Sequence, residues 1–332
     1  MRKNNTIKIS LIFTLLLSMQ ASAQLIGVFG DERAGTTSMT FLKIPVGARA
    51  EGMGDAFIGV PGDASSLWWN PAGIGLKRKG ELFLDHLQWP ADISYEYLGF
   101  TWPLGRVHTV GVALASLHMD DMPVTTIYHP EGDGTWWSFG DELIQLSWAV
   151  SLTNHFTGGI SVKYVRERLD DLTMSAPLLD MGTFYYTGFR DLTLAMSITN
   201  FGGVIRPAGT YQYREEDGSY SERRYKSFSP PTVFRLGSSM HVYQDDSMAL
   251  LAAVQVTHPV DNRENYNMGL ELDIHHHLQL RGGWKFHAEE ESWTAGIGTI
   301  LDIAEYSMRL DWSYSDFGLF GYSQRMSLLI GF

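Results

Sequence analysis

The stretch AEYSMRLDWSYSD (304–316) alternates between apolar or aromatic and polar side chains at every second residue. Its apolar and aromatic positions are Tyr306, Met308, Leu310, Trp312 and Tyr314. Successive side chains of a strand point to opposite faces, so a period of two predicts a strand with one apolar and one polar face. Residues 190–200 and 265–276 repeat the pattern.

Similar segments recur along most of the chain and favour a membrane barrel. Their length exceeds the mode of about 5–6 residues in soluble sheets and matches the roughly 9–11 residues of a tilted transmembrane strand. We count about fourteen, an even number as a single-chain bacterial barrel requires. The sequence therefore predicts an all-β fold, a transmembrane antiparallel β-barrel. The predicted strands are 81–88, 92–103, 106–118, 142–154, 156–169, 176–188, 190–202, 231–242, 247–258, 265–276, 277–286, 292–302, 304–316 and 322–332.

The lengths of the connections support the same fold. The two longest, 119–141 and 203–230, each follow an odd-numbered strand, whereas the connections at Leu104-Gly105, His155 and Phe189 follow even-numbered strands and are tight. Long external loops and short periplasmic turns are typical of outer-membrane barrels. A soluble β-sandwich has no reason to sort its loops in this way.

The amino-acid composition excludes several classes of function. The 332 residues carry a formal charge of −12 and contain no cysteine. An acidic chain is a poor general nucleic-acid binder, and the lack of cysteine excludes disulfides, thiolate metal sites and cysteine nucleophiles. The sequence shows no His-Glu-x-x-His pair or Gly-x-Ser-x-Gly elbow, so we expect neither a catalytic site nor a cofactor. The triplet His275–His277 predicts a polar turn rather than a metal site.

The N-terminus is typical of an exported protein. Arg2 and Lys3 precede a short apolar stretch, ISLIFTLLL (9–17), and Ala21-Ser22-Ala23 fits a cleavage site. This pattern predicts a signal peptide over residues 1–23. The alternative, a helical membrane anchor, needs about 20 apolar residues. We therefore expect signal-dependent export and a final location in the bacterial outer membrane, in contact with its lipid.

Residues 24–80 do not alternate and are predicted to form a hatch or plug folded into the lumen of the barrel (81–332), with a periplasmic cap as the alternative. Asp63 could cap a short helix over 64–68, and Asn70-Pro71 would end it. The chain ends on Phe332, and a closing strand with a terminal aromatic residue resembles the signal recognised by the barrel assembly machinery. The ten tryptophans and fifteen tyrosines suit aromatic girdles at the two membrane interfaces.

The segment FLKIPVGARAEGMGDAFIGVPGDASSLWWNPAGIG (41–75) resembles the N-terminal signature of the PorV/PorQ family, which belongs to the wider group of FadL-like barrels. Segments LRGGWKF (280–286), TAGIGTILD (294–302) and RLDWSYS (309–315) are similar to the family's closing strands. The resemblance implies a fourteen-stranded barrel. The signature positions are Phe41, Leu42, Ala48, Arg49, Met53, Gly54, Ala56 and Phe57, and the turn of the predicted hatch is Trp69, Asn70, Pro71, Ala72 and Gly73.

The resemblance implies two functions, both without catalysis. PorV-like members act in type IX secretion, where they bind the C-terminal signal domains of cargo and associate with the translocon and the attachment complex. FadL-like members pass hydrophobic compounds through the barrel wall, and their Asn-Pro-Ala segment belongs to a moving hatch. We expect the secretion role first. Passive uptake of a hydrophobic ligand is the alternative, and it predicts an apolar pocket beside Asn70-Pro71 and a lateral opening. A purely structural barrel is the third hypothesis, and it applies if neither a pocket nor a partner is found.

Overall fold

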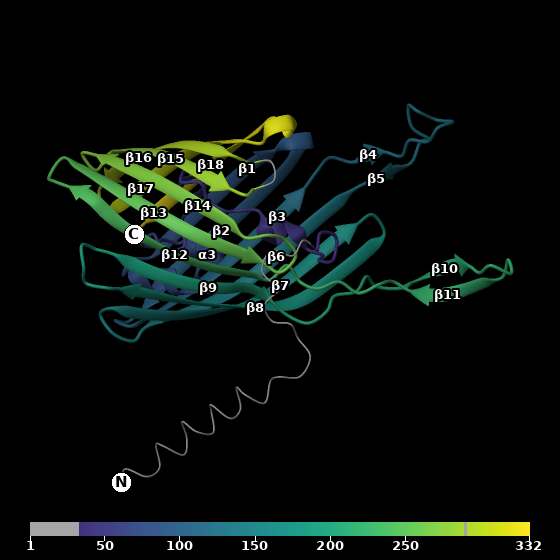
Figure 1. The fold of residues 1–332 in the computed structure, drawn as a ribbon, viewed down its shortest axis with the longest axis horizontal. Helices are drawn as coiled ribbons and strands as arrows, with labels where there is room; N and C mark the ends of the chain where they lie inside the picture. Colours follow the sequence, from purple (N-terminus) through teal and green to yellow (C-terminus); the bar gives the residue numbers. More distant parts are fainter. Residues whose placement is uncertain (1–32, 289–290) are drawn as a thin grey trace, which may run out of the picture.

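The computed structural model describes residues 33–288 and 291–332, and the predicted signal peptide over 1–23 lies outside these residues. The described chain forms fourteen long antiparallel strands that close into a single barrel, which confirms the predicted fold (Figure 1). Each long strand pairs with the next long strand along the chain, and β1 pairs with β18 to close the wall. These strands are β1 (Glu81–Trp89), β2 (Ile93–Leu104), β3 (His108–His118), β6 (Phe139–Ser151), β7 (Phe156–Leu169), β8 (Leu172–Tyr186), β9 (Thr193–Phe201), β12 (Val233–Gln244), β13 (Met248–Pro259), β14 (Asn265–Ile274), β15 (Leu278–Phe286), β16 (Trp293–Ile303), β17 (Tyr306–Asp316) and β18 (Tyr322–Gly331).

All fourteen predicted segments correspond to strands, but two are displaced in sequence. The strand predicted at 142–154 is β6 and ends at Ser151, because Thr153 Oγ1 accepts the backbone N–H groups of His155 and Phe156 and forms a turn there. The strand predicted at 176–188 is β8 and begins at Leu172, directly after a two-residue turn in which Asp170 has a positive φ of 52°. Alternation marks the faces of a strand but not its ends.

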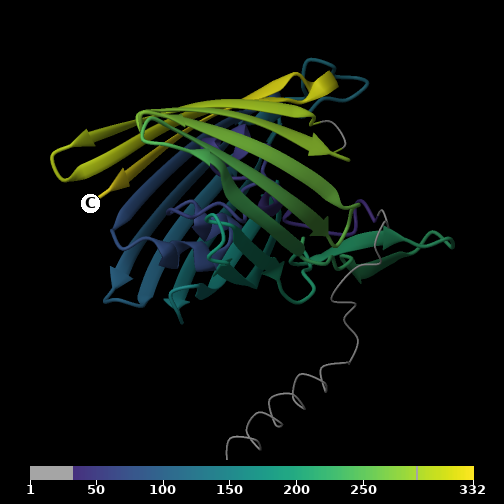
Figure 2. The ribbon, with the colours of Figure 1, turned by 60° about the vertical axis from the view of Figure 1, so that its left-hand side comes forward.

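The connections sort by length as predicted. The two longest each contain a small hairpin, formed by β4 (Met122–Pro123) with β5 (Trp136–Trp137) and by β10 (Thr210–Arg214) with β11 (Tyr220–Arg224). Both hairpins project from the same end of the barrel (Figures 1 and 2). We call this the loop end, and it corresponds to the external side in the predicted topology. The opposite end has short turns, among them His275–His277, which is the predicted polar turn between β14 and β15.

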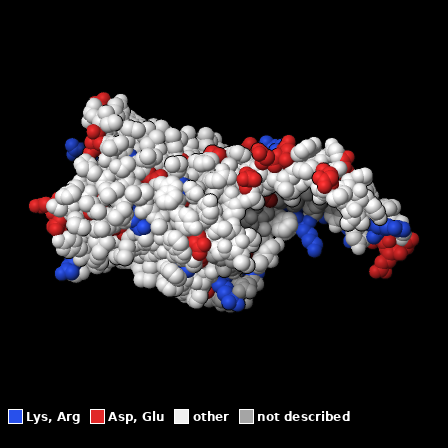
Figure 3. Space-filling view, turned by 90° about the horizontal axis from the view of Figure 1, so that it is seen from above, with Lys and Arg blue, Asp and Glu red and all other residues white. Residues whose placement is uncertain are grey.

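The two faces of the wall differ in chemistry. On β17, Leu310 is 49% exposed on the outer face, whereas the neighbouring Asp311 is 1% exposed inside the barrel. Trp293, Tyr314 and Tyr322 stack across three adjacent strands near the loop end, and Phe100, Trp102 and Phe332 form a second aromatic group at the other end. Figure 3 shows few charged side chains over the wall. An apolar outer band between aromatic girdles matches the cross-section of a bilayer.

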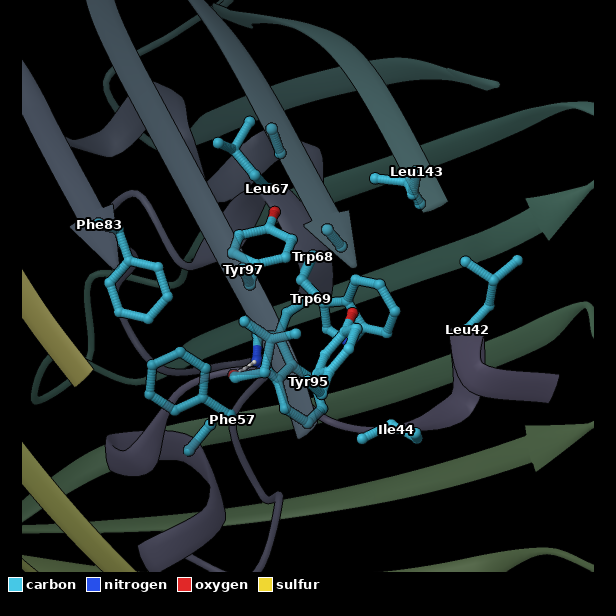
Figure 4. Packing of buried hydrophobic residues seen from close by; sticks show 14 of the residues in the cluster. Leu42, Ile44, Phe57, Leu67, Trp68, Trp69, Phe83, Tyr95, Tyr97 and Leu143 are labelled. Atoms are coloured by element: carbon cyan, nitrogen blue, oxygen red, sulfur yellow. Dashed lines mark hydrogen bonds between the residues drawn. The ribbon is translucent and has the colours of Figure 1, made fainter. Parts of the chain in front are cut away.

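The N-terminal segment (residues 33–80) lies inside the barrel and supplies about half of its buried apolar residues. Its short helices are η1 (Thr40–Lys43), α2 (Ala48–Gly52), α3 (Ser66–Trp69) and η2 (Pro71–Leu76). None of the helices described in the chain is long and apolar enough to cross a membrane. Figure 4 shows Phe57, Trp68 and Trp69 of this segment packed with Tyr95 and Tyr97 of β2. The inner wall is thus covered by a separate, mostly apolar stretch of chain.

The helix predicted at 64–68 is α3, which begins at Ser66 rather than at residue 64. Asp63 does not cap it as predicted, because Asp63 Oδ1 accepts the backbone N–H and the hydroxyl of Ser65, two residues further on. The predicted end at Asn70-Pro71 is confirmed, and Asn70 is extended with φ −159°. Asn70 Oδ1 then accepts the N–H of Ala72 and starts η2.

Candidate functional site

The Trp69–Gly73 turn is held tightly against the inner wall. Asn70 Nδ2 donates to the carbonyl oxygen of Thr183 on β8 at 3.0 Å, and Trp69 Nε1 donates to the carbonyl oxygen of Val46 at 2.8 Å. The wall has glycines where the turn touches it: a Cβ added to Gly159 would lie 2.4 Å from the backbone of the turn. The wall sequence and the turn sequence are therefore matched at this contact.

A closed ring of six charged side chains joins the N-terminal segment to the wall. Arg49 of α2 makes two hydrogen bonds to Glu271 on β14, at 2.6 and 2.7 Å. Glu271 also binds Arg281 on β15 at 2.6 Å, and Arg281 lies 2.8 Å from Asp311 on β17.

The remaining members close the ring. Arg309 lies 2.7 Å from Asp311 and 2.6 Å from Asp63, and Asp63 lies 3.9 Å from Arg49. Two of the six residues, Arg49 and Asp63, come from the N-terminal segment, and four come from strands β14, β15 and β17. Three cations alternate with three carboxylates, so each buried charge faces opposite charges on both sides. Arg49, singled out by the family signature, is therefore an anchoring residue of this ring.

Two further contacts hold the same segment. Arg325 of β18 lies between Glu51 of α2, at 3.2 Å, and Asp85 of β1, at 2.5 Å. Lys163 of β7 pairs with Asp180 of β8 at 2.6 Å and lies 5.2 Å from the centre of the Trp68 ring. The segment is thus fixed to the wall on several sides by charge as well as by packing.

The remaining residues of the family signature are packing residues in this fold. Each is buried against the inner wall or within the N-terminal segment, and backbone groups of Ala48 and Gly54 also hydrogen-bond to wall side chains. This group consists of Phe41, Leu42, Ala48, Met53, Gly54, Ala56 and Phe57. Phe332 exchanges backbone hydrogen bonds with Gly80, so the last residue of the chain is paired with the start of β1.

A cavity of about 570 Å³ remains at the loop end, between the N-terminal segment and strands β12 to β15. Two turns form its outer rim: η3 (Pro90–Asp92) between β1 and β2, and η4 (Gly318–Phe320) between β17 and β18. One part of its lining is apolar and aromatic, with Trp69, Trp89, Ile93, Phe317 and Phe320. The other part is polar, with Lys43, Asp55, Arg235, Gln255, Thr257, Asn262, Asn265, Asn267, Lys285, His287 and Glu291.

Most charges of this cavity are paired, but one is not. Lys43 binds Asp261 at 2.9 Å, and Lys285 binds Asp55 at 2.5 Å and also contacts Glu291. Arg235 is 5% exposed, and no carboxylate of the described residues lies within ion-pair distance of it. Its Nη1 donates to Thr199 Oγ1 at 2.9 Å, and its guanidinium carbon lies 5.5 Å from the centre of the Trp69 ring.

Two acids of the N-terminal segment, Asp63 and Asp55, respond differently to their surroundings. Burial tends to raise the pKa of Asp63, but Arg309 and Arg49 outweigh it and hold that pKa well below its usual range. Burial raises the pKa of Asp55 to about 6 although Lys285 opposes the rise, and Glu291 and Glu51 add to it. Asp63 therefore stays ionised in mild acid, whereas Asp55 loses its negative charge near pH 6.

The sequence anticipated part of this site. Of the predicted turn residues, Trp69 lines the cavity, while Asn70 to Gly73 lie on the other side, where η2 packs against β6, β7 and β8. Arg235 and Lys285 were missed. Both occupy inward positions of strands whose side chains alternate between apolar and polar. A charged residue at such a position is the sequence feature that could have identified them. The alternative function predicted an apolar pocket and a lateral opening; the cavity is instead mixed, and all neighbouring long strands of the described barrel are hydrogen-bonded.

Comparison with known proteins identifies the fold. No family model matches the sequence, and no curated protein matches it. Among solved structures, a CymD monoaromatic hydrocarbon channel shares 12% identity with a TM-score of 0.56, over 87% of this chain and 97% of that one. The chain has the fold of outer-membrane hydrocarbon channels.

Two other solved structures agree with this assignment. The Pseudomonas putida toluene transporter TodX shares 12% identity at a TM-score of 0.53, over 93% of this chain and 99% of that one. A Pseudomonas aeruginosa FadL homologue shares 12% identity at 0.52, over 92% and 99%. The wider FadL-like resemblance is therefore supported at the level of fold. The finer PorV/PorQ resemblance and the type IX role gain no support from these structures and stay predictions.

Proposed function

We propose that the protein is an outer-membrane channel for the passive entry of small hydrophobic or amphipathic compounds. The cavity at the loop end carries the proposal: its volume is typical of ligand sites, and aromatic rings line one part of it. The shared fold of the hydrocarbon channels supports the same function. Location in the outer membrane, after signal-dependent export, is part of the proposal.

In this proposal the N-terminal segment, with residues 24–80 as the predicted domain, acts as a hatch. It fills the barrel below the cavity, so a compound bound at the loop end has no straight route to the opposite end. The Trp69–Gly73 turn joins the two sides of the hatch, because Trp69 lines the cavity and Asn70 to Gly73 contact β6 to β8. Passage requires this segment to move away from the inner wall, and the contacts of the charged ring oppose that movement.

Uptake of labelled toluene tests the proposal. Cells that lack their own hydrocarbon channels and produce this barrel should take up toluene faster than cells without it. Trp89→Ala removes an aromatic ring from the cavity rim and should reduce the rate, whereas Trp148→Ala removes an outward-facing ring of the wall and is the matched control. Equal uptake with and without the barrel contradicts the proposal.

Participation in type IX secretion is the second proposal. The segment 41–75 motivates it, and the hairpin of β10 and β11 offers a projecting surface. There the rings of Tyr211 and Tyr225 lie 5.2 Å apart in a tilted arrangement, and Arg223 lies 3.8 Å from the centre of the Tyr213 ring. Tyrosine and arginine are enriched in protein interfaces. Cargo signal domains, translocon subunits or the attachment complex would be the partners. Unchanged export of cargo after gene deletion contradicts this role.

The barrel assembly machinery is a further proposed partner. Phe332 ends the closing strand, lies 5.9 Å from Trp102 between ring centres, and is still 38% exposed. A terminal aromatic side chain that keeps an accessible face after folding is consistent with a recognition signal used during insertion. We also propose that the apolar outer face of the barrel contacts the lipid of the outer membrane.

A further inference from the structure

The lining of the loop-end cavity is asymmetric in charge. Three cations, Lys43, Arg235 and Lys285, face two carboxylates, Asp55 and Glu291. Asp261 outside the lining neutralises Lys43, and the two carboxylates of the lining both bind Lys285. Arg235 is therefore the cation of the lining that has no carboxylate of the described residues within ion-pair distance.

Arg235 has guanidinium N–H groups for which no hydrogen bond is described. Of the five N–H groups of a guanidinium, one hydrogen bond is described, from Nη1 to Thr199. A buried cation without a counter-ion is costly unless an anion supplies the missing partner. Because the residue lines the cavity, a ligand could supply that anion, and the planar fork of arginine matches a carboxylate best.

The surroundings of Arg235 also constrain the body of the ligand. The ring of Trp69 lies beside the guanidinium, and Trp89 and Phe317 form an edge-to-face pair across the rim with ring centres 6.2 Å apart. Flat aromatic walls favour ring-shaped apolar groups, which pack against them in offset or edge-on arrangements. The amide side chains of Gln255 and Asn267 complete the polar side of the cavity.

We propose that the cavity selects compact aromatic monocarboxylates, with the carboxylate on Arg235 and the ring between Trp69 and the aromatic rim. This inference rests on the proposed channel function and specifies its substrate class. One unpaired cation fits one negative charge. A neutral hydrocarbon leaves Arg235 without a partner, so it binds less tightly than the acid of the same shape.

Equilibrium binding to the full-length barrel in nanodiscs tests the inference, with 2-naphthoate and its neutral analogue 2-naphthylmethanol as probes. Each probe is corrected for its partition into empty nanodiscs. A charge-assisted hydrogen bond at a buried site corresponds to about 10- to 100-fold in affinity. We expect the wild-type barrel to prefer 2-naphthoate by about that factor, and dodecanoate to bind less tightly than 2-naphthoate.

Substitutions locate the effect. Arg235→Gln should abolish the preference for 2-naphthoate while binding of 2-naphthylmethanol is retained, and Arg235→Lys should keep part of the preference. Arg224→Gln removes the same charge from the exposed hairpin strand β11 and should change neither affinity. Heat-modifiable migration on gels verifies that each variant is folded.

The outcomes separate this inference from the channel proposal. Equal affinity for both probes, or an unchanged preference in Arg235→Gln, overturns the carboxylate assignment even if toluene uptake depends on the barrel. Tighter binding of dodecanoate than of 2-naphthoate overturns the aromatic part of it. If the barrel binds neither naphthalene probe and does not raise toluene uptake, the channel proposal itself fails.

Discussion

Glu271 is the residue whose replacement should most directly loosen the N-terminal segment. It is 7% exposed, and it accepts two hydrogen bonds from Arg49 and one from Arg281. The variant Glu271→Gln keeps the shape of the side chain and removes its charge. Two arginines then lose their shared counter-ion, although Arg281 keeps Asp311.

The burial of this ion pair sets the free-energy cost of removing the charge of Glu271. Removing one partner of a buried ion pair costs about 3–5 kcal/mol, and the 17% exposure of the Arg49 side chain places the expected loss near the lower value, about 3 kcal/mol. Because about 1.4 kcal/mol corresponds to a factor of ten, the undocked state of α2 should become about 100-fold more populated. The wall strands keep their backbone pairing, so we expect local release rather than unfolding of the barrel.

Hydrogen exchange of the folded protein in nanodiscs measures this effect. Amides of residues 48–54 should exchange about 100-fold faster in Glu271→Gln, while amides of the wall strands should not change. Glu305→Gln makes the same chemical change at an exposed turn between β16 and β17 and is the control. In the double variant Arg49→Met/Glu271→Gln the loss should be smaller than the sum of the single losses, because the unpaired cation is removed.

The reasoning is refuted if exchange over residues 48–54 is the same in Glu271→Gln as in Glu305→Gln. That result would mean that apolar packing alone holds the segment and that the ring of charges contributes nothing to its docking.

Three further results are expected. Lowering the pH from 7.5 to 5.5 protonates Asp55, whose pKa is about 6, and so makes the cavity more positive. Because 2-naphthoate is still ionised at pH 5.5, calorimetry should show that it binds several-fold more tightly there than at pH 7.5. Weaker binding at pH 5.5 would contradict the expected direction of the change. Gly159→Ala should destabilise docking of the Trp69–Gly73 turn by about 1–3 kcal/mol, seen as faster exchange in η2, whereas Gly158→Ala has free space and should have no effect. Phe332→Ala should slow insertion by reconstituted assembly machinery and Phe332→Tyr should not; equal rates would remove its role as a signal.

The strands of the barrel wall and their topology could be predicted from the sequence alone. Alternation in segments such as 304–316 indicates which side of a strand faces lipid. Each outward side chain must be apolar whatever the rest of the fold, so the pattern can be recognised strand by strand. The parity of the long connections then fixed which end carries the loops. Strand ends such as Ser151 were displaced because local turn hydrogen bonds set them.

The functional site was less accessible to sequence reasoning. The turn at Asn70-Pro71 was predicted from local rules, but the ring of Arg49, Glu271 and their partners joins residues more than 200 positions apart. Arg235 has no carboxylate of the described residues within ion-pair distance, although Asp55 lines the same cavity, and this spacing is a property of the assembled barrel. A single sequence identifies an inward charge, but the fold identifies its neighbours.

A reversible cross-link between the N-terminal segment and the wall gives the most direct test of the proposed channel. The chain has no cysteine, so Ala48→Cys/Ser327→Cys introduces a single pair at a place where the backbone N–H of Ala48 donates to Ser327 Oγ at 2.6 Å. Each single-cysteine variant is the control. In proteoliposomes the oxidised double variant should take up labelled toluene more slowly than the single variants, and reductant should restore the rate. Uptake that is equally fast in the oxidised and reduced forms would contradict a channel gated by this segment.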